Sequence, residues 1–435
     1  MSSWWLERAL LPDGVVEGVR VEVADGRFTS VAKGVEPGDA TRLPGLTLPG
    51  LANCHSHAFH RALRGRTQED RGTFWTWREQ MYSLASRLDP DSYLLLARAA
   101  YREMALAGIT SVGEFHYLHH GPDGTPYDDP NAMGHVLVEA GREAGVRVVL
   151  LDTCYLAAGI GRAPEGVQRR FSDGTADAWA ERVEALDVRH RGAAVHSVRA
   201  VPRDQVPVVA DWARRHEAPV HVHLSEQVAE NDQCLDAYGV TPTALLDGAG
   251  ALGERTSAVH ATHLTDADIA LLGTSRTHAC FCPTTERDLG DGIGPSRQLH
   301  EAGAQLTLGS DSHAVVDLFE EMRAVELDER LVSQQRGHWA TDELLAAATV
   351  TGHRSLGIDD AGRIEAGARA ELVTLDTASP RTAGTGGGET TAVFAATAAD
   401  VVHVVADGVV VATAGDRAEV GAELETAIRK VWDLA

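Results

Sequence analysis

The sequence predicts an α/β protein, a TIM-like (β/α)8 barrel that carries a small β-sandwich domain built from both chain termini. Short apolar segments recur eight times, and Ala/Arg/Glu-rich amphipathic segments separate them. Both flanks of this region show the alternation of apolar and polar residues that is typical of antiparallel hairpins. Eight strand-helix units are the number that closes a parallel sheet on itself. An open, doubly wound sheet is the alternative, although the first unit carries no glycine-rich dinucleotide motif.

The eight apolar segments are the predicted barrel strands. In chain order they are Leu46 to His57, Thr110 to Tyr117, Val146 to Tyr155, Ala193 to Val201, Pro219 to Ser225, Ser257 to Leu264, Thr277 to Thr284 and Leu306 to Ser312. The stretches between them have helical composition and apolar spacing, as in Tyr93 to Leu106 and Pro207 to His216.

The two flanks predict one hairpin each. Val15 to Ala32 alternates apolar and polar residues around an Asp-Gly pair, and Asp400 to Ala412 places apolar runs on both sides of another. We expect these hairpins to pair into one small β domain. The predicted domains are residues 1–48 with 355–435 for the β domain and residues 49–354 for the barrel.

Charge and composition exclude several classes of partner and mechanism. The formal net charge of −24 argues against binding to nucleic acid or to an anionic membrane. The sequence shows no membrane-spanning segment and no signal peptide, and its five cysteines have no disulfide-like spacing, so we expect a cytoplasmic protein, as a homodimer. Lys33 and Lys430 are the only lysines. The central region therefore cannot use a Schiff base or a carboxylated lysine that bridges two metals.

Histidines and acidic residues follow the carboxyl ends of four predicted strands, the end where barrel enzymes place their sites. They are His55 and His57 after the first strand, His223 and Glu226 after the fifth, His260 after the sixth and Asp311 after the eighth. Alternate residues of a strand share a face, so the first pair can present two imidazoles to one ion.

We predict one catalytic divalent metal ion in this position. The predicted ligands are His55, His57, His223 and Asp311. Nitrogen-rich ligation favours zinc, with iron as the alternative, and such a metal activates a water molecule at neutral pH. Glu226 would lie beside that water and transfer its proton, while His260 would orient it. Cys280 and Cys282 share a strand face, but no further Cys or His pair lies near them, so we expect core packing rather than a second zinc site.

The motifs around these residues resemble the amidohydrolase superfamily, in its branch of mononuclear deaminases. They are Pro49-Gly50 before His55-Ser56-His57, His223 with Glu226, Val259 to Leu264, Cys282 to Glu286 leading to Leu289 to Gly292, and Gly309 to Asp311. In that family a barrel is flanked by a small β domain from both termini. The absence of a barrel lysine agrees with one metal ion rather than two.

A narrower resemblance is to the formimidoylglutamate deiminases of histidine degradation, a group within that family. It is carried by His55 to Phe59 with Arg61-Ala62, Phe74 to Tyr82, Gly113 to His120 and His196 to Val201. The resemblance implies hydrolysis of a formimino group, which yields N-formyl-L-glutamate and ammonia. In the implied mechanism, water attacks the formimino carbon, Glu226 moves the proton to nitrogen, and His260 with Asp311 stabilises and relays charge.

The substrate implied by this resemblance is a dicarboxylate, and an acidic protein needs local arginines to bind it. Arg78 and Arg199 are the predicted carboxylate ligands, with Tyr117 and His196 as hydrogen-bond donors. His60 departs from the family pattern, which has glutamine at this position, but an imidazole can also hydrogen-bond a carboxylate.

Two other functions stay open from the sequence. A related aminohydrolase that acts on a heterocycle, such as guanine, cytosine or a triazine, would have an aromatic pocket without arginine ligands for carboxylates. A catalytically silent metal-binding or assembly protein would lack a metal ligand or the acid/base residue, and this chain has all of them.

Overall fold

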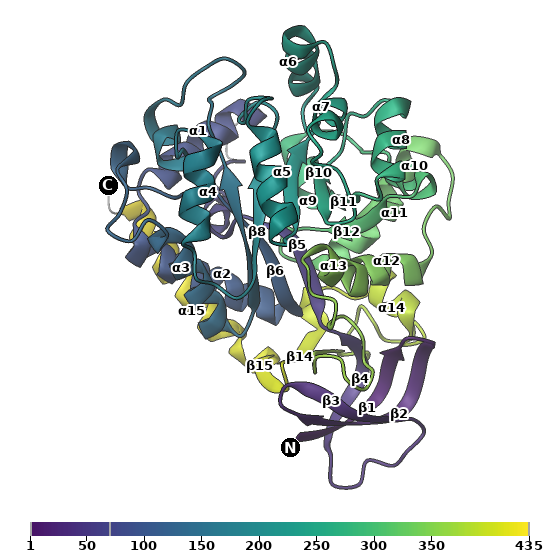
Figure 1. The fold of residues 1–435 in the computed structure, drawn as a ribbon. Helices are drawn as coiled ribbons and strands as arrows, with labels where there is room; N and C mark the ends of the chain where they lie inside the picture. Colours follow the sequence, from purple (N-terminus) through teal and green to yellow (C-terminus); the bar gives the residue numbers. More distant parts are fainter. Residues whose placement is uncertain (1, 69–70, 434–435) are drawn as a thin grey trace.

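The computed structural model describes residues 2–68 and 71–433, and its centre is a barrel of eight parallel strands (Figure 1). The strands are β5 (Leu51–Ser56), β6 (Ile109–His116), β7 (Arg147–Cys154), β8 (Arg191–Val195), β9 (Val220–Leu224), β10 (Thr256–His260), β11 (His278–Phe281) and β12 (Gln305–Leu308). Neighbouring strands pair in chain order, and a bridge between Ser56 and Asp311 joins the last unit to the first. Each predicted apolar segment overlaps one of these strands, so the barrel prediction is confirmed.

The first predicted strand is divided between two sheets. Leu46 to His57 was expected as one strand, whereas β4 (Thr41–Pro49) belongs to a second sheet and the barrel strand starts at Leu51. Gly50 lies at the crossing. A β-carbon there would lie 2.3 Å from Thr110 Oγ1 and 2.8 Å from the β-carbon of Glu371, so only glycine fits between the two sheets.

Helices surround the barrel (Figure 1). They are α1 (Phe74–Ala85), α2 (Pro90–Leu106), α3 (Ala132–Ala144), α4 (Ala176–Glu184), α5 (Val206–Arg215), α6 (Val228–Tyr238), α7 (Pro242–Gly248), α8 (Asp266–Thr274), α9 (Pro283–Leu289), α10 (Ser296–Ala302), α11 (Leu318–Ser333), α12 (Thr341–Ala348) and α13 (Val350–Ser355). Helix α2 begins three residues before the predicted Tyr93, because Asp89 caps it and Pro90 occupies its first turn. Among the described residues, no helix is both long and apolar enough to cross a membrane.

The second sheet draws strands from both ends of the chain, which confirms the predicted small β domain. Its order is β15-β14-β13-β4-β1-β2-β3. Besides β4 it contains β1 (Ser2–Leu11), β2 (Gly14–Ala24), β3 (Arg27–Ala32), β13 (Leu372–Leu375), β14 (Val401–Ala406) and β15 (Val409–Thr413). The predicted hairpins are β2–β3 and β14–β15, at opposite edges. Both turns use Asp-Gly pairs with positive φ at each residue, 51° and 73° at Asp25-Gly26 and 45° and 76° at Asp407-Gly408.

After α14 (Glu389–Phe394) and the hairpin β14–β15, the C-terminal part of the chain returns to the barrel. Helix α15 (Arg417–Asp433) lies along α2, where Glu419 pairs with Arg102 at 2.8 Å. The indole nitrogen of Trp432 donates to the carbonyl oxygen of Ala62 at 2.9 Å. We retain residues 1–48 with 355–435, and residues 49–354, as the proposed extents of the two domains, with α15 as a segment of the first that packs on the second.

Candidate metal centre and active site

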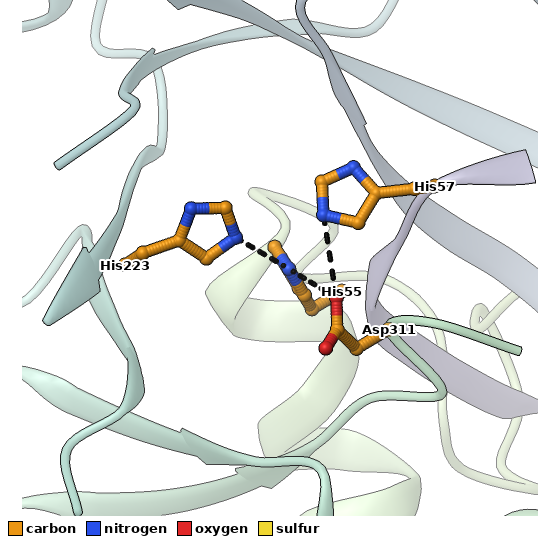
Figure 2. A group of neighbouring side chains, drawn as sticks. All are labelled: His55, His57, His223 and Asp311. Carbon is orange, nitrogen blue, oxygen red and sulfur yellow. Dashed lines mark hydrogen bonds and ion pairs between the residues drawn. The ribbon is translucent and has the colours of Figure 1, made fainter. Parts of the chain in front are cut away.

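Four side chains meet at the carboxyl end of the barrel: His55, His57, His223 and Asp311 (Figure 2). One ligand atom from each lies within 4.8 Å of the others. Nε2 of His55 and Nε2 of His57 are each 3.3 Å from Asp311 Oδ1. Nε2 of His223 lies 3.1 Å from Nε2 of His55. The structure therefore brings together all four residues that were predicted as metal ligands.

The donor chemistry of this cluster fits a bound cation. Nδ1 of His57 lies 2.9 Å from the carbonyl oxygen of Phe115, and Nδ1 of His223 lies 2.9 Å from that of His196. A carbonyl only accepts, so both rings carry their proton on Nδ1 and direct a lone pair from Nε2 toward the cluster. Burial lowers the pKa of His55 to about 4 and that of His223 well below its usual value. Neutral imidazoles and a carboxylate that point their lone pairs at one another are stabilised by a divalent cation between them.

Glu226 and His260 lie next to the cluster. Nε2 of His260 is 3.9 Å from Glu226 Oε1 and 3.9 Å from Asp311 Oδ2. Burial alone would lower the pKa of His260, but the charges of Glu226 and Asp311 and a hydrogen bond to Glu286 raise it well above its usual value. Burial raises the pKa of Glu226. The pair therefore consists of an imidazole that is held protonated and a carboxylate whose pKa is moved toward neutrality, a combination suited to proton transfer.

Backbone strain is present at the same strand ends. His260 has a φ of 68° and Asp311 a φ of 37°, in the left-handed region that residues with a β-carbon rarely adopt. Strain of this kind is typical of functional sites, where the surrounding packing holds a side chain in its working position.

Glu286 is a site residue that the sequence analysis did not assign. Its Oε1 accepts the backbone N–H of Cys282 at 2.9 Å and lies 3.4 Å from Nδ1 of His260. It fixes the imidazole from the side opposite Glu226. The only sequence signal was its place in the motif Cys282 to Glu286, to which no role had been given.

The cluster opens into a cavity at the carboxyl end of the barrel. Glu226 and His260 line it together with Asp311. All five predicted substrate-binding residues line it as well: His60, Arg78, Tyr117, His196 and Arg199. Much of the remaining wall is aromatic and comes from α1 and the segment after β7: Phe74, Trp77, Tyr82, Tyr155 and Phe171.

The two arginines differ in their surroundings. The guanidinium carbon of Arg78 lies 5.0 Å from the ring centroid of Trp75 and 5.2 Å from that of Tyr82, and no described carboxylate lies within ion-pair distance of it. Nε of Arg199, by contrast, donates to Glu230 Oε2 at 2.8 Å. Glu230 is fully buried and was not predicted. Arg78 therefore presents an uncompensated charge, while Arg199 is held in place by a carboxylate.

His60 and Tyr117 form one hydrogen-bonded pair. Nε2 of His60 lies 3.0 Å from the Tyr117 hydroxyl oxygen, and both side chains are buried. Burial lowers the pKa of His60 well below its usual value and raises that of Tyr117. His60 is therefore a neutral imidazole in the pocket. Its ring lies near Trp77, with centroids 5.2 Å apart.

His263 and His313 lie near the carboxyl end of the barrel and have hydrogen-bond partners outside the four-residue cluster. Nε2 of His263 donates to the carbonyl oxygen of Asp291 at 2.8 Å, and Nε2 of His313 lies 2.9 Å from Ser56 Oγ. Neither histidine lines the cavity. Cys280 and Cys282 are buried free thiols, and in the part of the chain that the structure describes neither belongs to a metal-binding group.

A second group with metal-ligand side chains lies outside the barrel wall, at His116, His119 and Asp152. Arg182 already pairs with both carboxylate oxygens of Asp152, at 2.8 Å and 2.9 Å. Nε2 of His119 donates to the carbonyl oxygen of Thr153 at 2.9 Å. These contacts describe a buried hydrogen-bonded network around an arginine, a poor environment for a second cation.

A parallel barrel with three imidazoles and a carboxylate at its carboxyl end, beside an acid/base pair, defines the class of metal-dependent barrel hydrolases. Sequence comparison gives the family: residues 46–411 match the model of the amidohydrolase family. The chain belongs to the amidohydrolase family and is a hydrolase that acts on C–N bonds.

Three relatives illustrate the similarity. Formimidoylglutamate deiminase of Pseudomonas aeruginosa is 38% identical over 399 residues, which cover 87% of each chain. A 5-methylthioadenosine/S-adenosylhomocysteine deaminase of Pelotomaculum thermopropionicum is 28% identical, over 92% of this chain and 90% of the relative. The crystal structure of an amidohydrolase from Brucella melitensis superposes with a TM-score of 0.89 at 32% identity, over 99% of this chain and 100% of that one.

Proposed function

We propose that the protein hydrolyses N-formimidoyl-L-glutamate to N-formyl-L-glutamate and ammonia, as a step of histidine degradation. The observation that carries the proposal is the uncompensated guanidinium of Arg78 in the same cavity as the four-residue cluster. A second guanidinium, that of Arg199, lines the cavity too, and the substrate has two carboxylates to match. The relative from Pseudomonas aeruginosa, at 38% identity, supports the same assignment.

His55, His57, His223 and Asp311 would hold one divalent metal ion. Three imidazole nitrogens and one carboxylate favour zinc, with iron as the alternative. Bound there, the ion would supply a water molecule acidic enough to be a nucleophile at neutral pH.

The acid/base pair handles the protons of the reaction. Glu226 accepts a proton as water attacks the formimino carbon and delivers it to the terminal nitrogen. It then carries the remaining hydroxyl proton of the tetrahedral carbon to the same nitrogen, which leaves as ammonia. His260, protonated between Glu226 and Glu286, orients the water, and with Asp311 stabilises the charge that develops at the tetrahedral carbon. In the net reaction one water adds, the terminal C–N bond breaks, and a formyl oxygen replaces the lost nitrogen.

The remaining cavity residues hold the glutamate part of the substrate. Arg78 and Arg199 would each bind a carboxylate, because a guanidinium can donate two parallel hydrogen bonds to one. Tyr117, His60 and His196 would complete the hydrogen bonds of the pocket.

A related aminohydrolase activity on a heterocycle is the second candidate. The aromatic wall that includes Trp77, Tyr155 and Phe171 favours it, as does the similarity to deaminases of nucleoside derivatives. A heterocyclic substrate without a carboxylate, however, would leave the charge of Arg78 without a counterion. Ammonia release from formimidoylglutamate, measured beside guanine, cytosine and a triazine, separates the two candidates.

Cellular location and assembly complete the proposal. The five cysteines are all free and buried, which suits the reducing cytoplasm. We propose a cytoplasmic homodimer that binds neither nucleic acid nor membrane. Sedimentation equilibrium of the purified protein tests the assembly.

A further inference from the structure

Two tyrosine hydroxyls and one buried amide form a group that the mechanism above does not use. Tyr82 of α1 and Tyr155, which follows β7, both line the cavity. Behind them lies Gln168, in the short helix η3 (Gly166–Phe171). Nε2 of Gln168 donates to the Tyr82 hydroxyl at 3.0 Å and to the Tyr155 hydroxyl at 2.9 Å. Gln168 is 5% exposed, so solvent does not compete for these bonds.

The orientation of the Gln168 amide is determined by a third contact. The backbone N–H of Glu165 donates to Gln168 Oε1 at 3.1 Å. The reversed amide would set its NH₂ group against that N–H, donor against donor. Both tyrosine oxygens therefore accept a hydrogen from Gln168, and each keeps its own hydroxyl proton to donate.

At least one of the hydroxyl protons of Tyr82 and Tyr155 is available to a ligand. Burial and the neighbouring Tyr82 hydroxyl raise the pKa of Tyr155, so its hydroxyl keeps its proton at neutral pH. Among the described residues, the only acceptor adjacent to either hydroxyl is the other one. A single hydrogen can join two oxygens, so at least one of the two protons has its acceptor in the cavity.

The charge around the hydroxyls selects the chemistry of that acceptor. The guanidinium carbon of Arg78 lies over the Tyr82 ring, 5.2 Å from its centroid. Phe171 packs against both tyrosines, with centroids 6.1 Å from Tyr82 and 5.4 Å from Tyr155, which limits the water around them. A cation, hydroxyl donors and an apolar wall together suit an anion with hydrogen-bond acceptors in a plane, which is a carboxylate.

We propose that Tyr82 and Tyr155, with Arg78, form a carboxylate subsite that selects the substrate, and that Gln168 is the residue that positions their protons. The inference rests on the proposed function and deepens it: it assigns one of the substrate's two carboxylates to this end of the cavity. Gln168 acts through the tyrosines, because its amide lies behind them.

Binding of the reaction product tests the subsite without turnover. Metal-loaded protein would be titrated calorimetrically with N-formyl-L-glutamate and with two truncated probes. In N-formyl-L-glutamine the side-chain carboxylate becomes an amide, and 4-(formylamino)butanoate lacks the α-carboxylate. The variants are Tyr82→Phe, Tyr155→Phe and their combination. Tyr238→Phe is the matched control, because Tyr238 ends α6 and lines a separate surface depression.

The double variant should bind N-formyl-L-glutamate about tenfold more weakly than wild type, as expected for the loss of a hydrogen bond to a charged group. For the truncated probe that lacks the carboxylate bound by the two tyrosines, the double variant should bind as tightly as wild type. Tyr238→Phe should bind all three compounds as wild type does. If the variants bind as tightly as wild type, or if they lose the same affinity for all three compounds, the proposed subsite is wrong while the proposed function stands. A wild type that binds none of the probes contradicts the proposed function and the subsite together.

Gln168→Glu tests the positioning role. Glutamate keeps an acceptor for the Glu165 N–H but replaces the donor by an oxygen that draws the tyrosine protons away from the cavity. It should weaken the binding of N-formyl-L-glutamate at least as much as the double variant does, and the metal content should be unchanged. Binding equal to wild type, in a protein with an unchanged unfolding midpoint, contradicts the role given to Gln168.

Discussion

The backbone N–H of Asp311 donates to the carbonyl oxygen of His55 at 3.0 Å, so the contact that closes the barrel also sets two of the proposed metal ligands side by side. The N–H of Ser310 donates to the same oxygen at 3.1 Å. Asn53 reinforces this contact between the first and last barrel units, since its side-chain oxygen accepts the Ser310 N–H at 2.9 Å. Ligand geometry is therefore a property of the closed barrel.

Metal removal should destabilise the folded protein, because the lone pairs of four ligands then face one another without a cation. A free metal concentration of 1,000 times the dissociation constant adds about 4 kcal/mol to the free energy of unfolding. Thermal unfolding before and after chelation, with zinc added back, measures this. Asp311→Asn should lose the response, and the surface variant His135→Gln should keep it. An unfolding midpoint indifferent to chelation in a demonstrably metal-loaded protein would contradict the ligand assignment.

Glu226→Gln should lower kcat by about a factor of 100 to 10,000, the usual contribution of a general acid/base group. Glutamine has nearly the same shape but cannot carry the proton. The metal content should remain that of wild type, since Glu226 is outside the ligand set. Steady-state ammonia release and metal analysis of the same preparation give both values. Turnover close to wild type would exclude Glu226 as the proton carrier.

Arg78→Met should raise KM for formimidoylglutamate by about tenfold to a hundredfold, because it removes a charge-assisted pair with a carboxylate. Methionine can still pack between Trp75 and Tyr82, so the effect isolates the charge. Arg142→Met, on the exposed face of α3, is the control, since Arg142 pairs only locally with Glu139. An unchanged KM in Arg78→Met would favour a heterocyclic substrate.

The buried network around Arg182 should make the fold acid-sensitive. Burial would raise the pKa of Asp152, but the charge of Arg182 outweighs it and lowers that pKa to about 2. A carboxyl whose pKa is lower in the folded state stabilises the fold above its unfolded pKa of about 4. This contribution, about 2 kcal/mol, is lost as the pH falls from about 4 to 2.

Urea unfolding between pH 2 and 7 measures this dependence. Arg182→Met should cost about 3 to 5 kcal/mol at pH 7, because it leaves Asp152 and Asp173 buried without their counterion. It should also remove the fall in the free energy of unfolding between about pH 4 and pH 2 that we attribute to Asp152. Arg142→Met, which removes an exposed ion pair, is the control and should leave the free energy of unfolding close to that of wild type. Unfolding free energies that are the same in Arg182→Met and wild type would disprove the coupling.

The sequence allowed prediction of features that are local or periodic. His55 and His57 share a strand face by spacing alone, and each apolar segment marks one barrel unit. The division of Leu46 to His57 was not predictable, because it depends on Glu371, more than three hundred residues away, beside Gly50. A strand that passes directly from one sheet into another leaves no break in the apolar pattern.

Residues that act through other residues were the ones missed. Glu286 and Glu230 lie on helices and have the spacing of ordinary surface carboxylates, but the fold turns them toward His260 and Arg199. Gln168 belongs to a short helix without any motif, and its role depends on Glu165, Tyr82 and Tyr155 together. Such pairings are set by tertiary packing, so composition and spacing do not indicate them.

The most direct test of the account is ammonia release by metal-loaded protein with N-formimidoyl-L-glutamate, measured beside guanine, cytosine and a triazine. We expect turnover of formimidoylglutamate, with N-formyl-L-glutamate and ammonia formed in equal amounts, and a kcat/KM far above that for any heterocycle. Release of ammonia from a heterocycle, with none from formimidoylglutamate, would contradict it.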